Sequence, residues 1–589
     1  MQIRLQEIIH QFEEGAGARY VKLVFVVILL VSLGVIYDLR AYRNMSAPEA
    51  MDAAQLGRNL AEGKGFTTLF VRPFSMYLLQ QHRADHSALL KTDHPDLANA
   101  PLYPLLLAGL MKVNAVPKQQ DTTEVKQFAV YQPDLRIAIF NQGLLLLAAL
   151  LLYCIATRLF DKAVGLLTVV VFAGCELFWR FSASGLSTLC LIVVMLGLVW
   201  TLAVLEGWAR GGRGVKSLLM LSVVAGMLVG AGGLTRYAFG WMIIPVLIFL
   251  ALFFGKNRVV LCLAALGAFL VVMAPWVGRN MLVSGMPFGT ATFTLLETTP
   301  EFPEDRLERS LNPSVRRVSL GDVGNKLVAG TREILRSDLP KAGGNWISAF
   351  FLVGLLVPFR NPGPSRVRWF LLAGLVVFVV VQALGRTFLT LESPEVNSEN
   401  LLVVLAPLII MFGVSLFFLF VDSIRFPLPA ARIALIVLFS LVASAQLIFA
   451  LLPPKTSALV YPPYSPPVMQ RTASWMGEKE LIMSDIPWAV AWYGKRQAIW
   501  ITLTWRKEFY EITDFHKPVA ALYLTQRTID SRFLSNWVRG ENHGWGNFLL
   551  ETIVRKEVPT GFPLSKSPQG LFPEQLFLTD FERWRVKDK

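Results

Sequence analysis

Two acidic residues stand in the polar stretch that follows the first apolar run of the chain. Glu49 and Asp52 are three positions apart, so on a helix their side chains share one face. A carboxylate at the mouth of a membrane-embedded cavity can take a proton from a hydroxyl and so act as a general base towards a lipid-linked substrate. Both acids are therefore candidate catalytic residues.

The same residues also have a purely structural interpretation. Ser46 followed three positions later by Glu49, with a proline between them, is a helix start signal. Ser46 would then be the N-cap and Glu49 would complete a capping box, which leaves Asp52 as a solvated charge. Leu56 and Leu60 of this helix could seat it on the membrane surface.

Membrane helices must position these residues. The chain has 589 residues, of which 54% are hydrophobic and 17% are charged, whereas soluble proteins carry about a quarter charged residues. The apolar residues come in long runs, and a helix needs roughly 20 of them to cross a bilayer. The four cysteines fall inside these runs, which indicates small buried side chains rather than disulfides or metal ligands. The composition predicts a polytopic α-helical membrane protein with about eleven transmembrane helices. The predicted spans are 21–38, 137–159, 164–181, 186–205, 218–234, 238–254, 259–277, 346–359, 369–384, 401–420 and 433–452.

The distribution of Lys and Arg in the short loops predicts the orientation. One alternate set of loops holds most of them, whereas the other set holds only Arg180, Arg236 and Arg386. By the positive-inside rule the first set is cytoplasmic. The N-terminus is then cytoplasmic, and an odd number of spans puts the C-terminus outside. The net charge of +14 is partly explained by this topology and does not require a nucleic-acid partner.

The spans and polar regions divide the chain into three parts. Residues 1–452 form a transmembrane domain with large outer loops at 39–136 and 279–345, and residues 453–467 form a proline-rich, semi-rigid linker. Residues 468–589 are long enough for a domain of their own. Helices and strands alternate in this tail, which predicts an extracytoplasmic α/β domain. The elements expected there are helices near 468–477 and 487–493 and strands at 480–484, 498–502 and 519–524.

The first outer loop resembles that of GT-C-fold glycosyltransferases, in particular the bacterial protein O-mannosyltransferase and aminoarabinose-transferase type that uses polyprenyl-phosphate sugars. The resemblance rests on Pro48-Glu49, Arg58-Asn59-Leu60 and Glu62-Gly63-Lys64-Gly65-Phe66. In that superfamily an acidic residue just after the first span is the catalytic carboxylate, which implies this role for Glu49. Ala50 stands where a second acid is usual, so Asp52 remains the alternative. The match also implies that Arg58 contacts the substrate.

A second segment is similar to the family's loop that enters a surface-lying helix. It reads His94-Pro95-Asp96-Leu97-Ala98-Asn99-Ala100-Pro101. The family often has a basic residue before a proline pair here, and this chain lacks it, so no lysine contact to phosphate is implied. His94 and Asp96 could line the same cavity, or the segment is only a turn before a proline-started helix.

Arginines at the outer ends of spans are candidates for binding a phosphate. Two further segments are similar to the family: Leu234-Thr235-Arg236, and Pro275-Trp276 with Arg279-Asn280. Arg236, Arg279 and Arg386 could each present a planar donor fork to phosphate oxygens. The alternative is that such side chains snorkel to lipid headgroups, which we favour for Arg180. The loop 392–400 faces the same side and could touch the acceptor or the sugar, although we favour an ordinary solvated loop.

The sequence carries no signature that requires a cofactor. The histidines lack the spacing of a closed zinc site, and no P-loop or dinucleotide fingerprint is present. Glu49, Asp52 and Asp96 with a sugar phosphate could still hold one Mg²⁺ or Mn²⁺ ion.

The resemblance implies an inverting glycosyltransferase of the bacterial inner membrane. It would move a hexosyl or pentosyl group from a polyprenyl-phosphate donor to a hydroxyl of an acceptor lipid, glycan or protein on the extracytoplasmic side. The alternative is a non-catalytic protein that binds or transports a lipid-linked sugar. A transporter would be expected to have an internal repeat and charges at mid-bilayer, and the spans contain few such charges.

Overall fold

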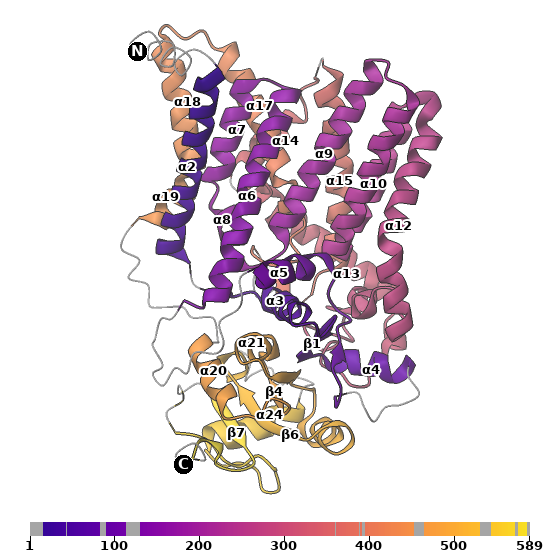
Figure 1. Ribbon diagram of the computed structural model, residues 1–589, viewed down its shortest axis with the longest axis vertical. Helices are drawn as coiled ribbons and strands as arrows, with labels where there is room; N and C mark the ends of the chain where they lie inside the picture. The colour runs from indigo at the N-terminus through magenta and orange to yellow at the C-terminus, as the bar shows by residue number, and fades with distance from the viewer. Residues whose placement is uncertain are drawn as a thin grey trace.

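The architecture is given by a computed structural model, in which a long helical bundle ends in a small α/β unit (Figure 1). Residues 453–464 of the predicted linker lie outside the described residues. The described residues are 16–42, 44–82, 90–113, 130–344, 346–359, 361–387, 389–390, 395–452, 465–529, 543–569, 571 and 575–585.

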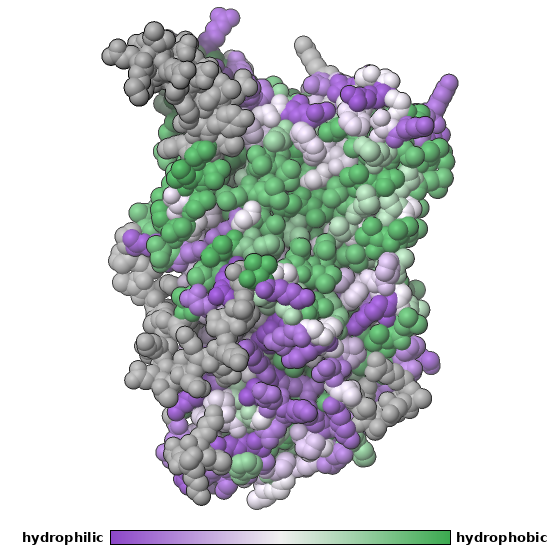
Figure 2. Space-filling view, in the orientation of Figure 1, coloured by the Kyte–Doolittle hydropathy of each residue, from purple (hydrophilic) through white to green (hydrophobic). Residues whose placement is uncertain are grey.

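Long apolar helices form the bundle, and a hydrophobic band covers them in Figure 2. Besides the single long helices, two bent pairs reach a spanning length only if each pair is counted as one span. They are α7 (Lys162–Gly174) with α8 (Glu176–Ser184), bent by 56°, and α18 (Pro429–Ala443) with α19 (Ala445–Leu451), bent by 58°. The described part thus has six candidate spans, or eight with the bent pairs. The six are α6 (Gln132–Leu159), α9 (Thr188–Arg210), α10 (Val215–Thr235), α12 (Arg258–Ser284), α15 (Pro362–Leu384) and α17 (Leu402–Ser423).

The predicted spans all contain helices, but the count of eleven is not reached in the described part. Helix α2 (Ala16–Ala41) covers the first of them. The predicted span 238–254 consists of a 3-10 segment, η1 (Tyr237–Met242), and the short helix α11 (Ile243–Phe253). The predicted span 346–359 contains α14 (Ile347–Gly354), whose 8 residues rise only about 12 Å. An apolar run therefore need not supply a helix of membrane-spanning length.

Helices α10 and α12 bring two of the predicted phosphate-binding arginines to the same end of the bundle. A Cβ atom added at Gly226 of α10 would lie 2.0 Å from the carbonyl oxygen of Ala265 in α12. Only glycine permits this close approach, as is usual where membrane helices pack tightly. Arg236 directly follows α10, and Arg279 lies in the last turns of α12.

The first outer loop folds against this end of the bundle. It contains α3 (Pro48–Ala61), β1 (Thr67–Thr68), β2 (Phe70–Val71), α4 (Pro73–His82), β3 (His94–Pro95) and α5 (Leu102–Val113). The N-cap of α3 is Ala47, which makes no side-chain cap hydrogen bond, so the predicted capping box of Ser46 and Glu49 is wrong. Leu56 is fully buried in the protein, so it does not seat the helix on a membrane surface.

A five-stranded sheet joins the first outer loop to the tail. The tail contributes α20 (Pro466–Ser474), β4 (Leu481–Ser484), α21 (Pro487–Tyr493), β5 (Gln497–Trp500), β6 (Val519–Leu524) and β7 (Leu576–Thr579). The strand order is β2-β5-β4-β6-β7, with only β7 antiparallel to its neighbour. At the edge, Phe70 pairs with Ala498 and Val71 with Ile499. The tail and the first outer loop therefore share one sheet.

Buried side-chain hydrogen bonds fasten α21 to the rest of the molecule. Arg58 donates from Nη1 to the carbonyl oxygen of Trp492 and from Nη2 to that of Ala491, each at 2.7 Å. Asp134, in the first turn of α6, accepts from Trp492 Nε1 at 2.7 Å and from the Tyr493 hydroxyl at 2.6 Å. Arg58 thus satisfies the carbonyls that a helix leaves unpaired at its C-terminal end.

We predict that Arg58→Met loosens the tail. The change leaves two buried carbonyl oxygens without their charged donor, which should cost about 2–4 kcal/mol of stability. The expected result is a lower melting temperature and faster proteolysis within 465–529. Arg471→Met is the control, because Arg471 is exposed on α20 of the same unit. Equal proteolysis of the two variants would contradict the docking role of Arg58.

Candidate active site

A cavity of about 1130 Å³ lies where the bundle, the outer loops and the tail meet. Its volume is slightly above the range that ligand pockets usually have. The walls come from segments that are far apart in the sequence. The polar lining residues include Glu49, Arg72, Asn99, Arg236, Glu297, Glu308, Gln382 and Glu399.

One wall of the cavity is apolar and reaches the outer surface of the bundle. Trp241 and Ile244 line it from η1 and α11, and Val376 and Val380 line it from α15. Trp241 is 55% exposed and Val376 is 65% exposed. Since these side chains face both the cavity and the apolar surface, the cavity has a lateral apolar side on which a hydrocarbon chain could lie.

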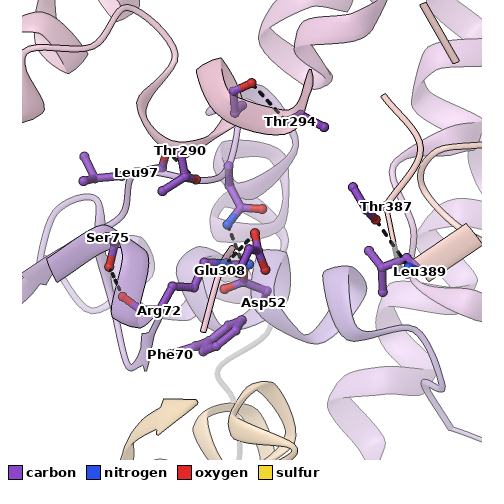
Figure 3. A network of polar contacts seen from close by, with 12 residues as sticks. Asp52, Phe70, Arg72, Ser75, Leu97, Thr290, Thr294, Glu308, Thr387 and Leu389 are labelled. Atoms are coloured by element: carbon purple, nitrogen blue, oxygen red, sulfur yellow. Dashed lines mark hydrogen bonds and ion pairs between the residues drawn. The ribbon is translucent and has the colours of Figure 1, made fainter. Parts of the chain in front are cut away.

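Asp52 lies behind the cavity wall with both carboxylate oxygens engaged. Its Oδ2 accepts from Arg72 Nη2 at 2.8 Å and from Asn99 Nδ2 at 2.9 Å, while Oδ1 accepts from Gln55 Nε2 at 3.2 Å. The side chain is only 1% exposed and does not line the cavity. Figure 3 shows Arg72 reaching towards Asp52. Asp52 is therefore held as the partner of a buried cation.

Arg72 lies at the centre of this network. Its guanidinium lies 4.1 Å from the ring centroid of Phe70, and its Nε is 3.5 Å from Glu308 Oε1 (Figure 3). Burial acts to lower the pKa of Arg72, but the carboxylates of Asp52 and Glu308 outweigh it and raise the pKa. Burial in turn raises the pKa of Glu308, which Arg72 partly offsets. Arg72 thus stays charged and lines the cavity.

Glu49 and Arg236 both line the cavity. Glu49 is half-buried in the first turn of α3, and its Oε1 accepts from the backbone N–H of Ser398 at 3.2 Å. Arg236 Nη2 donates to Ser187 Oγ at 3.2 Å and to Thr188 Oγ1 at 3.4 Å. Its buried Nη1 has no hydrogen-bond partner among the described residues. Such an unused cationic donor can bind an anion.

The charge of Arg236 persists at neutral pH. Burial lowers the pKa of Arg236 to about 10, and the carboxylates of Glu49 and Glu399 oppose this shift. The arginine is therefore a cation beside two acids, and a phosphate at its free Nη1 would add a third negative group to a partly desolvated site.

The remaining predicted residues lie outside the cavity lining. Asp96 is buried and accepts from the backbone N–H of Asn99 at 2.9 Å, and Arg279 donates to the Asp96 carbonyl oxygen at 2.7 Å. His94 Nε2 lies 2.8 Å from the Ser75 hydroxyl. Arg386 pairs with Asp338 at 2.6 Å, and Arg58 lies under α21. The fold thus brings only Glu49 and Arg236 together in the cavity, with Asp52, Asp96 and Arg279 in a layer behind.

Sequence reasoning missed the other charged residues of the lining. Arg72 follows the edge strand β2, and Glu297 and Glu308 come from the second outer loop. Glu399 accepts from the hydroxyls of Thr387 and Thr390, so the interpretation of 392–400 as a solvated loop is wrong at this residue. Residues 391–394 lie outside the described part. In the sequence these residues appear only as charged residues in polar loops. Most solvated loops contain such residues, so the pattern does not indicate a site.

The described residues do not fit the predicted Mg²⁺ or Mn²⁺ ion. Among them no group of three or more His, Cys, Asp or Glu side chains is arranged to hold a metal. Of the three predicted ligands, Asp52 has both oxygens engaged and only Glu49 lines the cavity.

Comparisons with known proteins agree with this architecture. The family model described as dolichyl-phosphate-mannose-protein mannosyltransferase matches residues 131–278. The oligosaccharyltransferase of Archaeoglobus fulgidus in the apo form aligns with a TM-score of 0.51 and 11% identity, covering 87% of this chain and 71% of that chain. ArnT from Cupriavidus metallidurans in the apo state aligns with a TM-score of 0.44 and 11% identity, covering 96% of this chain and 99% of that chain. No curated protein matches the sequence.

The chain has the fold of membrane-embedded GT-C glycosyltransferases. The likeness to the archaeal enzyme shows this fold, and the family match lies within the helical bundle. The predicted resemblance to polyprenyl-phosphate-dependent transferases of this fold is confirmed, and membrane glycosyl transfer is supported as the general activity.

We predict that Asp96→Asn flattens the pH dependence of stability. Burial, with the charge of Asp52, raises the pKa of Asp96 from its usual 3.8 to about 6. The folded state then holds an extra proton, so this stabilisation is complete below about pH 4 and is lost as the pH rises through 6. Asparagine stays neutral, so thermal unfolding of the variant should not show this decline. Asp93→Asn, at an exposed position of the same loop, is the control, and parallel curves for both variants and wild type would refute the assignment.

Proposed function

We propose that the chain is an inverting glycosyltransferase of the bacterial inner membrane. It moves a hexosyl or pentosyl group from a polyprenyl-phosphate donor to an acceptor hydroxyl on the extracytoplasmic side. Its N-terminus is cytoplasmic and its C-terminal α/β unit extracytoplasmic. The observation that carries the proposal is the pairing of an available carboxylate, Glu49, with a cation that has an unused donor, Arg236, in one cavity with a lateral apolar wall.

The cavity suggests how the donor binds. Its polyprenyl chain lies along the apolar wall formed by η1, α11 and α15, where Trp241 and Val376 reach the bundle surface. Its phosphate meets the free Nη1 of Arg236. Hydrogen bonds to charged groups are stronger than neutral ones, and partial exclusion of water strengthens them further. The sugar then lies on the side of the cavity that carries Glu49.

Glu49 is the better candidate for the general base. Asp52 has three donors on its two oxygens, whereas Glu49 accepts from the backbone N–H of Ser398 alone among the described residues. Glu49 accepts the proton of the acceptor hydroxyl while that oxygen bonds to the anomeric carbon. The bond from the anomeric carbon to the phosphate oxygen breaks, and the phosphate keeps the electron pair with its charge met by Arg236. A single displacement of this kind inverts the anomeric configuration. Asp52 acts through Arg72 as a positioning residue.

We predict that Glu49→Gln lowers kcat about 10²- to 10⁴-fold, the usual contribution of a general base, with an unchanged melting temperature. Transfer from a radiolabelled polyprenyl-phosphate sugar in purified protein measures it. Glu62→Gln, at the exposed end of the same helix, is the control and should keep full activity.

Asp52→Asn should differ in kind from Glu49→Gln. It removes one partner of a buried ion pair, so we expect a lower melting temperature together with partial loss of activity. If Glu49→Gln keeps wild-type transfer while a stably folded Asp52→Asn loses it, Asp52 is the base. If both variants keep wild-type transfer, the site is wrong.

We predict that Arg236→Met weakens phosphate binding by roughly 10- to 100-fold, the value of a hydrogen bond to a charged group. Binding of undecaprenyl phosphate alone, measured by isothermal titration in detergent, tests it without turnover. Arg180→Met is the matched control, because Arg180 pairs with Glu395 at the surface. Equal affinities for the two variants would place the phosphate elsewhere.

A further inference from the structure

The tail supplies an aromatic wall to the cavity. Trp488, which follows β4, and Trp500, the last residue of β5, both line it. Their ring centroids are 5.4 Å apart with the planes at 90°. Phe70 of β2 packs edge-on against both, at 5.9 Å and 5.8 Å. The two indoles are thus fixed by packing, and only their edges contribute to the cavity wall.

The indole N–H of Trp488 has no acceptor among the described residues. Trp488 is only 1% exposed. Two other buried indoles of the tail show the usual arrangement, since Trp492 donates to Asp134 and Trp545 donates to the Thr502 carbonyl oxygen at 2.9 Å. Buried Trp N–H groups normally find a partner, and an unmade hydrogen bond is costly. An unpaired donor on a residue that lines a cavity points to a ligand that supplies the acceptor.

The sheet topology places this donor where ligands usually bind. Within the tail β4 comes first in the sequence, and the two strands that follow pair on opposite sides of it, β5 on one side and β6 on the other. In open parallel sheets, ligands bind outside the carboxyl ends of the strands where the order reverses. Asp485 follows β4 and accepts from the backbone N–H of Thr525 after β6 at 2.9 Å. The Asp485 Oδ1 is a second buried atom there with no partner in the described part of the chain. Arg527 lies 4.8 Å from the Trp488 ring and joins the two loops.

We infer that this wall is a carbohydrate subsite, and that the acceptor of the proposed transfer is a glycan. A pyranose ring lies against the edges of Trp488 and Trp500, and one of its oxygens accepts from Trp488 Nε1. The inference rests on the proposed function, because it names the acceptor of that reaction. The acceptor enters from the aqueous side formed by the tail and presents a hydroxyl to Glu49.

The surrounding groups favour a neutral, hydroxyl-rich ligand over the alternatives. Glu308 and Glu297 also line the cavity, which disfavours an anionic acceptor near the tail. Carboxylates accept hydrogen bonds from sugar hydroxyls. An extended peptide would gain most from a free strand edge, and β2, at the sheet edge beside the cavity, is only 2 residues long. A glycan uses side-chain groups alone, which is what the wall offers.

The test compares Trp488→Phe and Trp500→Phe with a matched control. Trp475→Phe makes the same change in the same unit, where Trp475 packs on Phe577 and does not line the cavity. The probes are methyl β-glucopyranoside, methyl β-galactopyranoside and diacetylchitobiose, and a hexapeptide containing Ser and Thr represents the other acceptor class. Saturation-transfer NMR on the full chain in nanodiscs measures binding without turnover.

We expect at least one saccharide to bind wild type and the peptide not to bind. Trp488→Phe should weaken saccharide binding about three- to tenfold, the value of one hydrogen bond. The smaller ring leaves space in a packed wall, so binding is measured at a temperature at which each variant is folded. Trp475→Phe should bind as wild type does. The inference is overturned if no saccharide binds wild type, if Trp488→Phe and Trp500→Phe bind as tightly as Trp475→Phe, or if only the peptide binds.

Turnover separates this inference from the proposed function. Hydrolysis of the donor without acceptor reports the chemistry alone. Trp488→Phe should raise the KM for a saccharide acceptor, whereas Trp475→Phe should change neither this KM nor the rate of hydrolysis. If saccharides bind but neither hydrolysis nor transfer occurs, the proposed function fails and the subsite stands. If transfer to the peptide occurs and is insensitive to Trp488→Phe, the function stands and the subsite fails.

Discussion

The buried guanidinium of Arg72 is the interaction on which the rest of the site depends. It pairs with Asp52 of α3 and with Glu308 of the second outer loop, and it stacks on Phe70 of the sheet. A buried charge is tolerated only when its partners are in place, and removal of one partner leaves the others uncompensated. The three elements must therefore dock together before any of them is stable in this position. Their docking also forms one wall of the cavity, because Phe70, Arg72 and Glu308 all line it.

The same pairing divides the roles of two acids that the sequence places side by side. Asp52 and Glu49 are one turn apart on α3, yet Asp52 meets Arg72 and Asn99 while Glu49 lines the cavity. A carboxylate whose lone pairs are taken by a cation and an amide is poorly able to accept a further proton. The neighbour that the buried cation does not reach remains available. Function at Glu49 thus depends on the structural use of Asp52.

The sequence predicted what depends on local pattern, and it failed where a residue's partner is distant. Helices occupy the predicted spans, and β6 and α21 begin and end at the predicted residues, because apolar runs and strand alternation are local signals. Arg58 looked like a phosphate ligand, but its acceptors are carbonyls 433 and 434 positions away. A helix C-terminus and a phosphate both present negative oxygens to a guanidinium. The prediction that Leu56 contacts the membrane failed for a similar reason. A leucine on a helix face can pack against lipid or against the protein interior, because both are apolar.

The edge strand β2 makes the tail part of the site rather than an appended module. Two residues cannot form a strand alone, so the position of Phe70 and Val71 is set by their pairing with β5. Arg72 is the next residue, and its guanidinium lies on the Phe70 ring that also contacts Trp488 and Trp500. Any shift of the sheet relative to the bundle would move Arg72 away from Asp52. Phe70 contacts the wall that we assign to the acceptor, and Arg72 is the cation that fixes α3 beside Arg236. These two residues are only two positions apart, so the wall and the cation cannot move independently.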